Sequence, residues 1–321
     1  MTTVEVLAEP LLEALEPASR GPRVVALGGG HGLAQALTAI RGYAARITAV
    51  VSVADDGGSS GRLAAGLRLP PPGDCRRALL ALSPDDTPWR LAVAHRFEAG
   101  DVAGHSLGNL LLAGLAARSG LEEALSLLGG LLGARGRVIP AAPVPLTLRA
   151  AVDGEEVRGQ VAIALSRGRI ESVAVDPQDA AASPSAVEAL AEADQVVVGP
   201  GSLFTSLAAT LVVPGMAEAV NASPGRLVYV CNLATQDGET LGMDGAAHVR
   251  ALCEVGGLRL PDVVVANDAP FRVAADVEAV WAGPEVAALG LRVEAAALAD
   301  AVATRPRHDP TRLGAVLRRL A

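Results

Sequence analysis

The chain has 321 residues, of which 50% are hydrophobic and only 2% aromatic, and its net charge is −8 at pH 7. All 27 basic residues are arginines, which excludes a Walker A lysine, a Schiff-base lysine and a kinase-type strand lysine. The acidic balance argues against a nucleic-acid-binding protein, although local arginines and helix N-termini can still bind a small anion.

The cysteines and the N-terminus bear on the cellular compartment. Cys75, Cys231 and Cys253 form neither a CxxC pair nor a zinc-type spacing, as is typical of a reducing compartment. Residues 1–22 are acidic, rich in proline and without a basic start, so we expect an N-terminal appendage rather than a secretory signal. The uncharged stretch 196–217 contains Gly-Pro-Gly and a further proline, which disfavour a membrane helix. These features predict a cytoplasmic protein with no membrane insertion.

From residue 23 onward, short apolar runs alternate with helical stretches. This alternation predicts an α/β fold, an open and mainly parallel sheet with helices on both faces, in one domain over residues 23–321. Residues 137–176 differ, because three apolar stretches are separated by DGEE and SRGR turns. We expect them to form a small antiparallel insertion away from the central crevice. The apolar runs that define the main sheet are 23–27, 47–54, 195–199, 226–232 and 262–268.

Glycines and polar residues follow five of these runs. Because ligands of open parallel sheets bind outside the carboxyl ends of the strands, these residues are expected to form one site. Turn formation alone would not require polar residues at the end of every strand.

The first loop, GGGHGL, lies where a Rossmann phosphate loop is found. Its candidate ligand-binding residues are Gly28, Gly29, Gly30, His31, Gly32 and Leu33. Glycines let the backbone approach a diphosphate, and the next helix offers free N–H groups. The match to GxGxxG is imperfect, since Leu33 replaces the third glycine. A tight turn without a ligand is the alternative interpretation.

The second loop, ADDGGSSGR, combines two acids, two hydroxyls and an arginine. A flexible turn explains part of it, but Asp55 or Asp56 could hold ribose hydroxyls or Mg²⁺. Arg62 could face a phosphate. The predicted ligand-binding residues of this loop are Asp55, Asp56, Ser59 and Arg62.

Two further stretches contribute candidates near this loop. In PPPGDCRR, Asp74 could be a helix N-cap or, together with Arg76, reach the site. In HSLGNLLL, Asn109 is the polar residue placed to serve a ligand.

The later strand ends repeat the pattern of the first loop. Gly199, Gly201 and Ser202 form a second glycine loop, in which Ser202 could bind a sugar or phosphate or simply cap a helix. The loop after residue 231 is unusually polar and supplies Asn232, Thr235 and Gln236, and Arg307 precedes the last helix. There is no nucleophile elbow and no HExxH, and the five histidines show no metal-ligand spacing.

As an ordered set, these motifs resemble the YvcK/CofD-like family, the gluconeogenesis factors. The matching stretches are GGGHGL, ADDGGSSGRL, PPGDCRRALLAL, GHSLGNLLLAGL, VVVGPGSLFTS, PGMAEAV, NLATQDGET and RHDP, in family order from residue 28 to residue 310. The resemblance implies a Rossmann-like fold and a nucleotide-type ligand. Its YvcK branch implies binding of UDP-N-acetylglucosamine and roles in cell shape, envelope precursor supply and gluconeogenic growth.

The CofD branch implies a Mg²⁺-dependent 2-phospho-L-lactate transferase, which would place the metal among Asp55, Asp56 and Asp74. That branch typically carries Asn-Thr-Gly-Asp-Asp after the second strand, whereas this chain has Ala-Asp-Asp-Gly-Gly at 54–58, which favours the YvcK branch. Asp237 stands where proline is commoner, and 268–290 has no tyrosine to stack on a ligand.

Three hypotheses follow, in this order. The first is a UDP-sugar-binding regulator that requires no cofactor and no metal, with homo-oligomerisation left open. The second is the Mg²⁺-dependent transferase. The third, suggested only by a glycine loop and an acid, is an NAD-dependent oxidoreductase.

Overall fold

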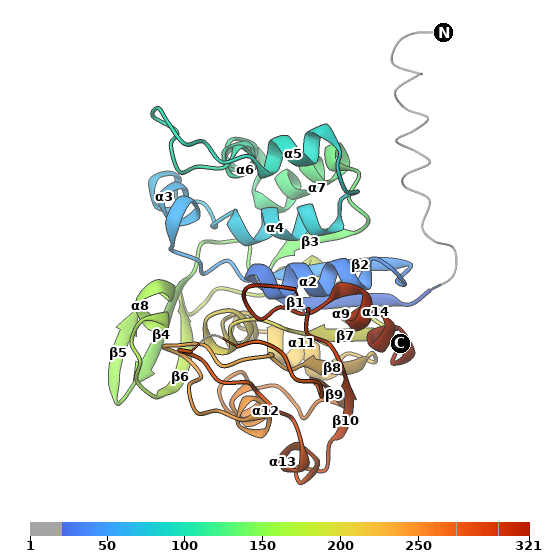
Figure 1. Ribbon diagram of the computed structural model, residues 1–321. Helices are drawn as coiled ribbons and strands as arrows, with labels where there is room; N and C mark the ends of the chain where they lie inside the picture. Colours follow the sequence, from blue (N-terminus) through green and yellow to red (C-terminus); the bar gives the residue numbers. More distant parts are fainter. Residues whose placement is uncertain (1–20, 274, 301) are drawn as a thin grey trace.

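The computed structural model describes residues 21–273, 275–300 and 302–321 (Figure 1). The appendage expected at 1–22 therefore lies outside the described residues, except for its last two. The centre of the fold is a seven-stranded sheet in the order β10-β9-β8-β7-β1-β2-β3, with every neighbouring pair parallel. Its strands are β1 (Arg23–Gly28), β2 (Arg46–Val51), β3 (Arg137–Pro140), β7 (Gln195–Val198), β8 (Arg226–Val230), β9 (Val263–Asn267) and β10 (Arg292–Ala296).

The strand order places a topological switch point at the middle of the sheet. From β1 the chain adds β2 and β3 on one side, then returns to β7 on the other side of β1 and continues outward to β10. The loops that follow β1 and β7 therefore leave neighbouring strands in opposite lateral directions and open a crevice between them.

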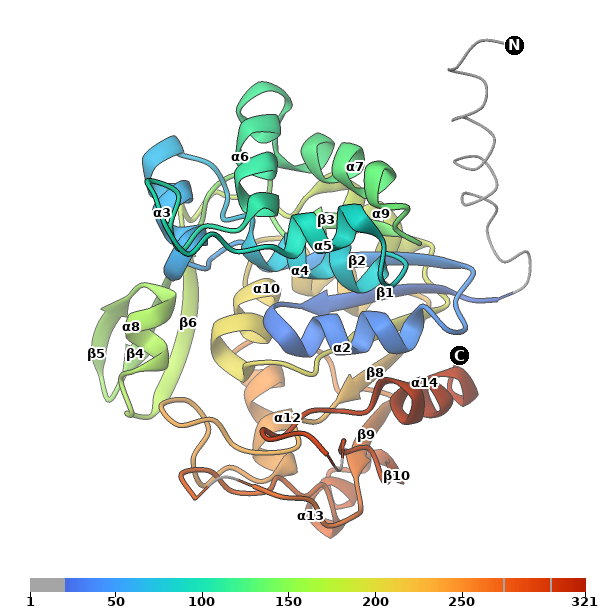
Figure 2. The ribbon, with the colours of Figure 1, turned by 45° about the horizontal axis from the view of Figure 1, so that its top comes forward.

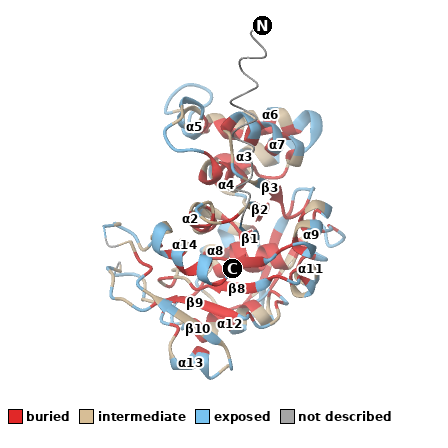
Figure 3. Ribbon diagram, turned by 90° about the vertical axis from the view of Figure 1, so that its right-hand side faces the viewer, coloured by how far each residue is buried: buried red, intermediate tan, exposed pale blue. Residues whose placement is uncertain are grey.

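Helices cover both faces of this sheet, as its continuously apolar strands require. Figure 3 shows α2 (Gly30–Ile40), α4 (Gly73–Leu82) and α14 (Pro310–Arg319) on one face, and α9 (Pro184–Ala191) and α11 (Met216–Ala222) on the other. The strands between them are buried, with Val196, Val197 and Val198 fully shielded from solvent. This confirms the predicted α/β sandwich, whose core relies on aliphatic side chains.

Further helices extend these layers. At the top of Figure 1, a group beyond β3 contains α3 (Gly58–Leu67), α5 (Pro88–Ala94), α6 (Leu107–Ser119) and α7 (Leu121–Leu132). The second half of the chain adds the π-helix η1 (Leu203–Ala208), α10 (Ala209–Leu211), α12 (Gly245–Glu254) and α13 (Pro284–Ala287).

The expected antiparallel insertion forms only in part. A three-stranded antiparallel sheet contains β5 (Glu155–Arg158), β4 (Thr147–Val152) and β6 (Ile170–Asp176), in that order. Within the expected range 137–176, however, β3 pairs with β2 in the main sheet, and 160–164 forms the short helix α8 (Gln160–Ala164) instead of a strand.

The antiparallel insertion lies beside the acidic loop. The backbone N–H of Val161 in the first turn of α8 donates to Asp56 Oδ1 at 3.0 Å. Gly159, whose φ is +97°, ends β5 and lets the chain turn into α8, and the free N–H groups of a helix start attract a carboxylate. Figure 2 shows the insertion next to the loop that leads into α3.

In the described part of the chain, no single helix is long and apolar enough to cross a membrane. The segments Leu203–Leu211 and Met216–Ala222 meet such limits of length and composition only as a pair, and they are bent by 77°.

We expect the contact between α14 and α2 to depend on Gly314. A Cβ atom on Gly314 would lie 2.9 Å from the carbonyl oxygen of Ala39. Gly314→Ala should therefore lower the free energy of unfolding by about 1–3 kcal/mol through overpacking, despite the better helix propensity of alanine. The matched control is Gly114→Ala in α6, where nothing lies within 4 Å; it should raise stability by up to about 1 kcal/mol. Equal effects of both changes in urea unfolding would contradict the close helix contact.

Candidate functional site

The two glycine loops meet at the switch point between β1 and β7. A side chain on Gly32, in the first turn of α2, would collide with the carbonyl group of Pro200. Gly199 and Gly201 have φ values of +81° and +156°, a range that favours glycine. The loops that the sequence placed at neighbouring strand ends are thus in direct contact.

A cavity of about 690 Å³ opens above these loops, a size that suits a small-molecule ligand. Eight of the predicted residues line it: His31, Gly32, Gly201, Ser202, Asn232, Thr235, Gln236 and Arg307. The rest of the lining consists of Gln35, Pro200, Leu233, Ala234, Asp237, Asp276, Val277, Arg305, Pro306 and His308.

Several polar side chains of this cavity fix its walls. Asn232 accepts the Gly201 N–H at Oδ1 (3.0 Å) and donates from Nδ2 to the Gly201 carbonyl (2.8 Å). Ser202 Oγ donates to Gln236 Oε1 at 2.8 Å. Thr235 Oγ1 accepts the Glu278 N–H at 2.8 Å, and Thr235 is buried. Asn232 and Thr235 therefore position the loops as well as border the cavity.

Protein carboxylates already occupy part of both helix N-termini. At α2, the Gly30 N–H donates to Asp74 Oδ2 at 2.6 Å. At η1, the N–H groups of Phe204 and Thr205 donate to Glu239 Oε2 at 3.1 and 3.3 Å. Asp74 lies inside the first turn of α4 without capping it, so the N-cap interpretation was wrong.

Glu239 was not among the predicted site residues, although its polar loop was noted. Its carboxylate also accepts hydrogen bonds from Thr205 Oγ1 (2.5 Å) and Gln236 Nε2 (3.0 Å). Burial raises the pKa of Glu239 despite these four bonds. The burial of this acid is explained by the N–H groups of Phe204 and Thr205, which bind its carboxylate. No sequence pattern indicates that these groups lie next to Glu239.

For a ligand, the helix starts leave other donors. Within the described residues, no protein acceptor takes the N–H groups of His31 and Gly32 on α2 or of Ser202 and Leu203 at η1. Burial, followed by the charge of Arg77, lowers the pKa of His31, which keeps the imidazole mainly neutral at pH 7.

The remaining polar candidates form a second group beside the cavity. None of Asp55, Asp56, Ser59, Arg62, Asp74, Arg76 and Asn109 lines the cavity above the glycine loops. Asp55 Oδ1 accepts the Gly57 N–H at 2.9 Å, and burial raises the pKa of Asp55. Arg62 Nη2 donates to the Ala103 carbonyl at 3.4 Å. Asp74 connects the two groups, because it binds Gly30 of the first loop and Arg77 of its own helix.

The three acids assigned to Mg²⁺ by the transferase hypothesis face different partners. Asp55 binds the Gly57 N–H, Asp56 the first turn of α8, and Asp74 the first turn of α2. In the described part of the chain, no group of three or more His, Cys, Asp or Glu side chains is arranged as metal ligands.

Four further predicted residues, one in the core and three glycines, do not line the cavity. Leu33 is 1% exposed and packs in the hydrophobic core. Gly28, Gly29 and Gly199 lie beneath the cavity; a Cβ on Gly29 would approach Asp74 Oδ2 to 2.7 Å. Arg307 pairs with Asp300 (Nη2–Oδ2 2.6 Å). Arg305, which sequence reasoning missed, lines the cavity and forms no ion pair with any described carboxylate.

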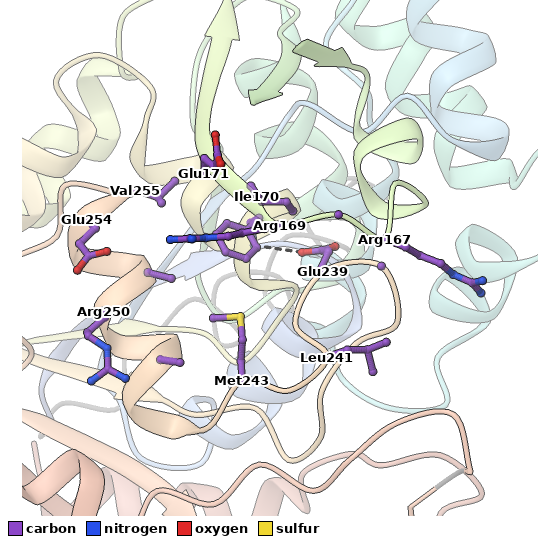
Figure 4. Close-up of a pocket in the computed structure, with 15 residues that line it drawn as sticks. Arg167, Arg169, Ile170, Glu171, Glu239, Leu241, Met243, Arg250, Glu254 and Val255 are labelled. Carbon is purple, nitrogen blue, oxygen red and sulfur yellow. Dashed lines mark hydrogen bonds between the residues drawn. The ribbon is translucent and has the colours of Figure 1, made fainter. Parts of the chain in front are cut away.

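A second cavity, also of about 690 Å³, is lined in part by residues of the 238–243 loop (Figure 4). Its walls carry Arg167, Arg169, Met243 and Arg250, and Glu239 lies at its inner end. It contains none of the predicted ligand-binding residues. Charges of both signs line it, and it has no glycine loop at a strand end.

Comparisons with known proteins identify the family of the chain and support its fold. The family model described as 2-phospho-L-lactate transferase CofD matches residues 24–295, so the chain belongs to the CofD family. A Mycobacterium tuberculosis protein is 43% identical over 308 residues, covering 92% of this chain and 89% of its own. The gluconeogenesis factor of Bacillus subtilis is 38% identical over 311 residues, covering 92% and 97%. The crystal structure of a UPF0052-family protein from Bacillus halodurans superposes with a TM-score of 0.89 at 36% identity, covering 94% of this chain and all of that one.

His308 provides a test of burial at the cavity wall. Its ring is 3% exposed, and its Nε2 has no hydrogen-bond partner among the described residues. Burial lowers the pKa of His308 to about 4 from 6.5. Between these values the unfolded chain binds more protons than the folded one, so the free energy of unfolding falls as pH falls from about 6.5 to 4.

We expect this histidine to contribute a loss of about 3 kcal/mol over that pH interval. Above pH 7 the contribution should be constant. Urea unfolding of wild type and His308→Gln at a series of pH values measures it, since the variant cannot titrate there. His95→Gln, the same change at an exposed histidine, is the matched control. Parallel pH curves for wild type and His308→Gln would show that the ring is accessible to solvent.

Proposed function

We propose, from the chain's membership of the CofD family, that the cavity binds a UDP-sugar, UDP-N-acetylglucosamine, and that the protein is a cytoplasmic ligand-sensing regulator. The proposed cellular roles are control of cell shape, of envelope precursor supply and of growth on gluconeogenic carbon. One observation carries the ligand proposal: two glycine loops touch at the switch point of a parallel sheet, beneath a cavity of about 690 Å³.

The charges around the loops support a specific place for the diphosphate. Asp74 and Glu239 would repel a diphosphate from the N–H groups that they already bind. The free N–H groups of His31 and Ser202 remain, on the two sides of the cavity floor. Arg305, which has no ion-pair partner among the described residues, adds a positive charge. We therefore place the diphosphate across both loops, on the side of Arg305.

Acceptors for hydroxyl groups are present in the same cavity. Asp276 and Gln35 lie on its walls, and Asp237 is joined to Arg167 by a 2.7 Å ion pair. Carboxylates accept hydrogen bonds from vicinal hydroxyls, as acidic residues do for ribose in other nucleotide sites. These side chains are the proposed partners of the ribose and the sugar.

The competing hypotheses make different demands on these residues. A transferase would need Asp55 and Asp74 to exchange their present N–H partners for Mg²⁺, and its turnover would depend on metal. An NAD-dependent enzyme would require close helix packing on a dinucleotide, and Leu33 fills the third glycine position. We favour the regulator because the cavity offers free loop N–H groups and arginine, and neutralising a diphosphate there needs no metal.

We expect UDP-N-acetylglucosamine to raise the melting temperature without added Mg²⁺. At a hundredfold excess over Kd, a ligand of the folded state adds about 2.7 kcal/mol of stability, which corresponds to roughly 5 °C for a chain of this size. UDP alone should give a smaller shift, because the sugar contacts are lost, and NAD should give little. A melt that responds to NAD but to no UDP-sugar would overturn the proposal.

The second binding prediction concerns Arg305. Arg305→Gln should weaken UDP-N-acetylglucosamine binding roughly tenfold or more, the scale of a lost charge-assisted hydrogen bond. Arg318→Gln, in the last turn of α14, makes the same charge change outside the cavity and should leave the affinity unaltered. Titration calorimetry measures both. Equal affinities for Arg305→Gln and wild type would move the diphosphate away from this side of the cavity.

A further inference from the structure

Arg76 is a buried cation without a carboxylate partner. It is 6% exposed, and the one hydrogen bond of its side chain to a described residue runs from Nε to Asn109 Oδ1 at 2.9 Å. No described acid forms a salt bridge with it, whereas its neighbour Arg77 pairs with Asp74. Buried charges in proteins are normally paired, because removing an ion from water is costly. The Nη groups of Arg76 make no hydrogen bond to a described residue and are not fully enclosed, so an external anion can reach this guanidinium.

The surroundings hold this guanidinium in one orientation. A Cβ on Gly108 would lie 2.6 Å from Arg76 Cδ, so the missing side chain makes room for the arginine stem. Asn109 is fixed in turn, because its Nδ2 donates to Ser59 Oγ at 3.0 Å and Ser59 Oγ contacts His105 Nδ1 at 2.9 Å. The GHSLGN motif, which the UDP-sugar cavity does not use, thus builds the support of Arg76.

A second arginine without an ion pair lies near Arg76. The backbone of Arg96 forms an isolated β-bridge with Ser106, whose Oγ accepts the N–H of Asn109, the hydrogen-bond partner of Arg76. Arg96 is exposed, donates from Nη1 to the Gly104 carbonyl at 2.5 Å, and pairs with no described acid. Burial first, and then the charges of Arg77 and Arg96, lower the pKa of Arg76 to about 10, so the group stays charged at neutral pH. The charge of Asp74, which pairs with Arg77, acts in the opposite direction and raises the pKa of Arg76. Three arginines therefore share one close carboxylate, and a surplus of two positive charges remains.

We propose that Arg76 and Arg96 bind the phosphate group of a second small-molecule ligand, a phosphomonoester, at a site separate from the UDP-sugar cavity. A phosphate dianion matches two unpaired guanidinium groups in charge, and its oxygens accept from their N–H donors. A carboxylate would neutralise only one of them. Neither arginine lines the cavity above the glycine loops, and the Asp74 carboxylate lies between that cavity and Arg77.

Inorganic phosphate is the probe, titrated calorimetrically at constant ionic strength. Arg96→Gln should weaken phosphate binding roughly tenfold, and because Arg96 is exposed the variant should fold. The control Arg118→Gln, also exposed and in the last turn of α6, makes the same change in net charge and should bind like wild type. Absence of phosphate binding by wild type, or an equal loss in both variants, would overturn the proposal.

Arg76→Met separates a binding role from a structural one. It keeps an unbranched stem but removes the unpaired charge, so in phosphate-free buffer it should melt at or above the wild-type temperature and no longer respond to phosphate. A lower melting temperature with unchanged phosphate affinity would make Arg76 a structural residue. If this variant does not fold, Arg96→Gln decides.

A final titration distinguishes this site from the proposed UDP-sugar site. With UDP-N-acetylglucosamine at saturation, the phosphate affinity should be unchanged and the two shifts in melting temperature should add. Competition between the ligands would place the phosphate in the nucleotide cavity and reject a separate site. Failure of UDP-N-acetylglucosamine to bind would count against the proposed function alone, because the phosphate titration does not require it.

Discussion

The contact between the two glycine loops is the constraint on which the rest of the site depends. β1 and β7 are adjacent parallel strands, and the chain leaves them in opposite lateral directions. The first turn of α2 can approach the Pro200 carbonyl only because residue 32 has no side chain. Asn232 then ties the second loop to the end of β8 by two hydrogen bonds. The floor of the cavity is thereby built from backbone groups of three neighbouring strand ends.

The second feature of the site is that protein carboxylates take part of the helix ends that anions usually occupy. Asp74 at α2 and Glu239 at η1 hold the helices in place without any ligand, and they leave N–H groups at the first residues of each helix. The proposed diphosphate would therefore bind in front of these carboxylates, beside the neutral His31 and the cation Arg305. The two carboxylates therefore hold the helix ends in position, while the positive charge of Arg305 lies to one side of them.

The sequence predicts the sheet and the edge at which a ligand binds. It does not predict how the candidate ligand-binding residues are spread along that edge from strand to strand. Apolar runs mark the strands, and parallel strands must end at one edge, so the location of Gly32, Gly201 and Asn232 follows directly. The strand order depends on tertiary packing. Because β2 and β8 are three strands apart, the loops after them are separated by roughly 14 Å. The acidic loop with Asp55 consequently falls outside the cavity that contains Asn232.

Other differences have the same tertiary origin. β3 is a short apolar run beside the insertion, and only its pairing with β2 makes it part of the main sheet. The carboxylate of Asp56 accepts a hydrogen bond from the N-terminal turn of α8. From the sequence alone, the same carboxylate could equally have bound a ligand. The hydroxyl of Thr235 is used by the Glu278 N–H, far along the chain. In each case, the partner of the strand or side chain lies far away in the sequence, so the spacing of residues does not predict the contact.

Two buried ionisable residues show how such partners separate a structural role from a binding role. Glu239 and Arg76 are 7% and 6% exposed, and both have pKa values shifted by burial toward their neutral forms. Glu239 accepts four hydrogen bonds from groups of the fold, which satisfies its carboxylate and explains it as a structural clamp. The side chain of Arg76 donates one hydrogen bond, and the charges of Arg77 and Arg96 lower its pKa while that of Asp74 raises it. Because the fold gives this guanidinium no salt bridge, Arg76 is the residue for which we propose an anionic ligand.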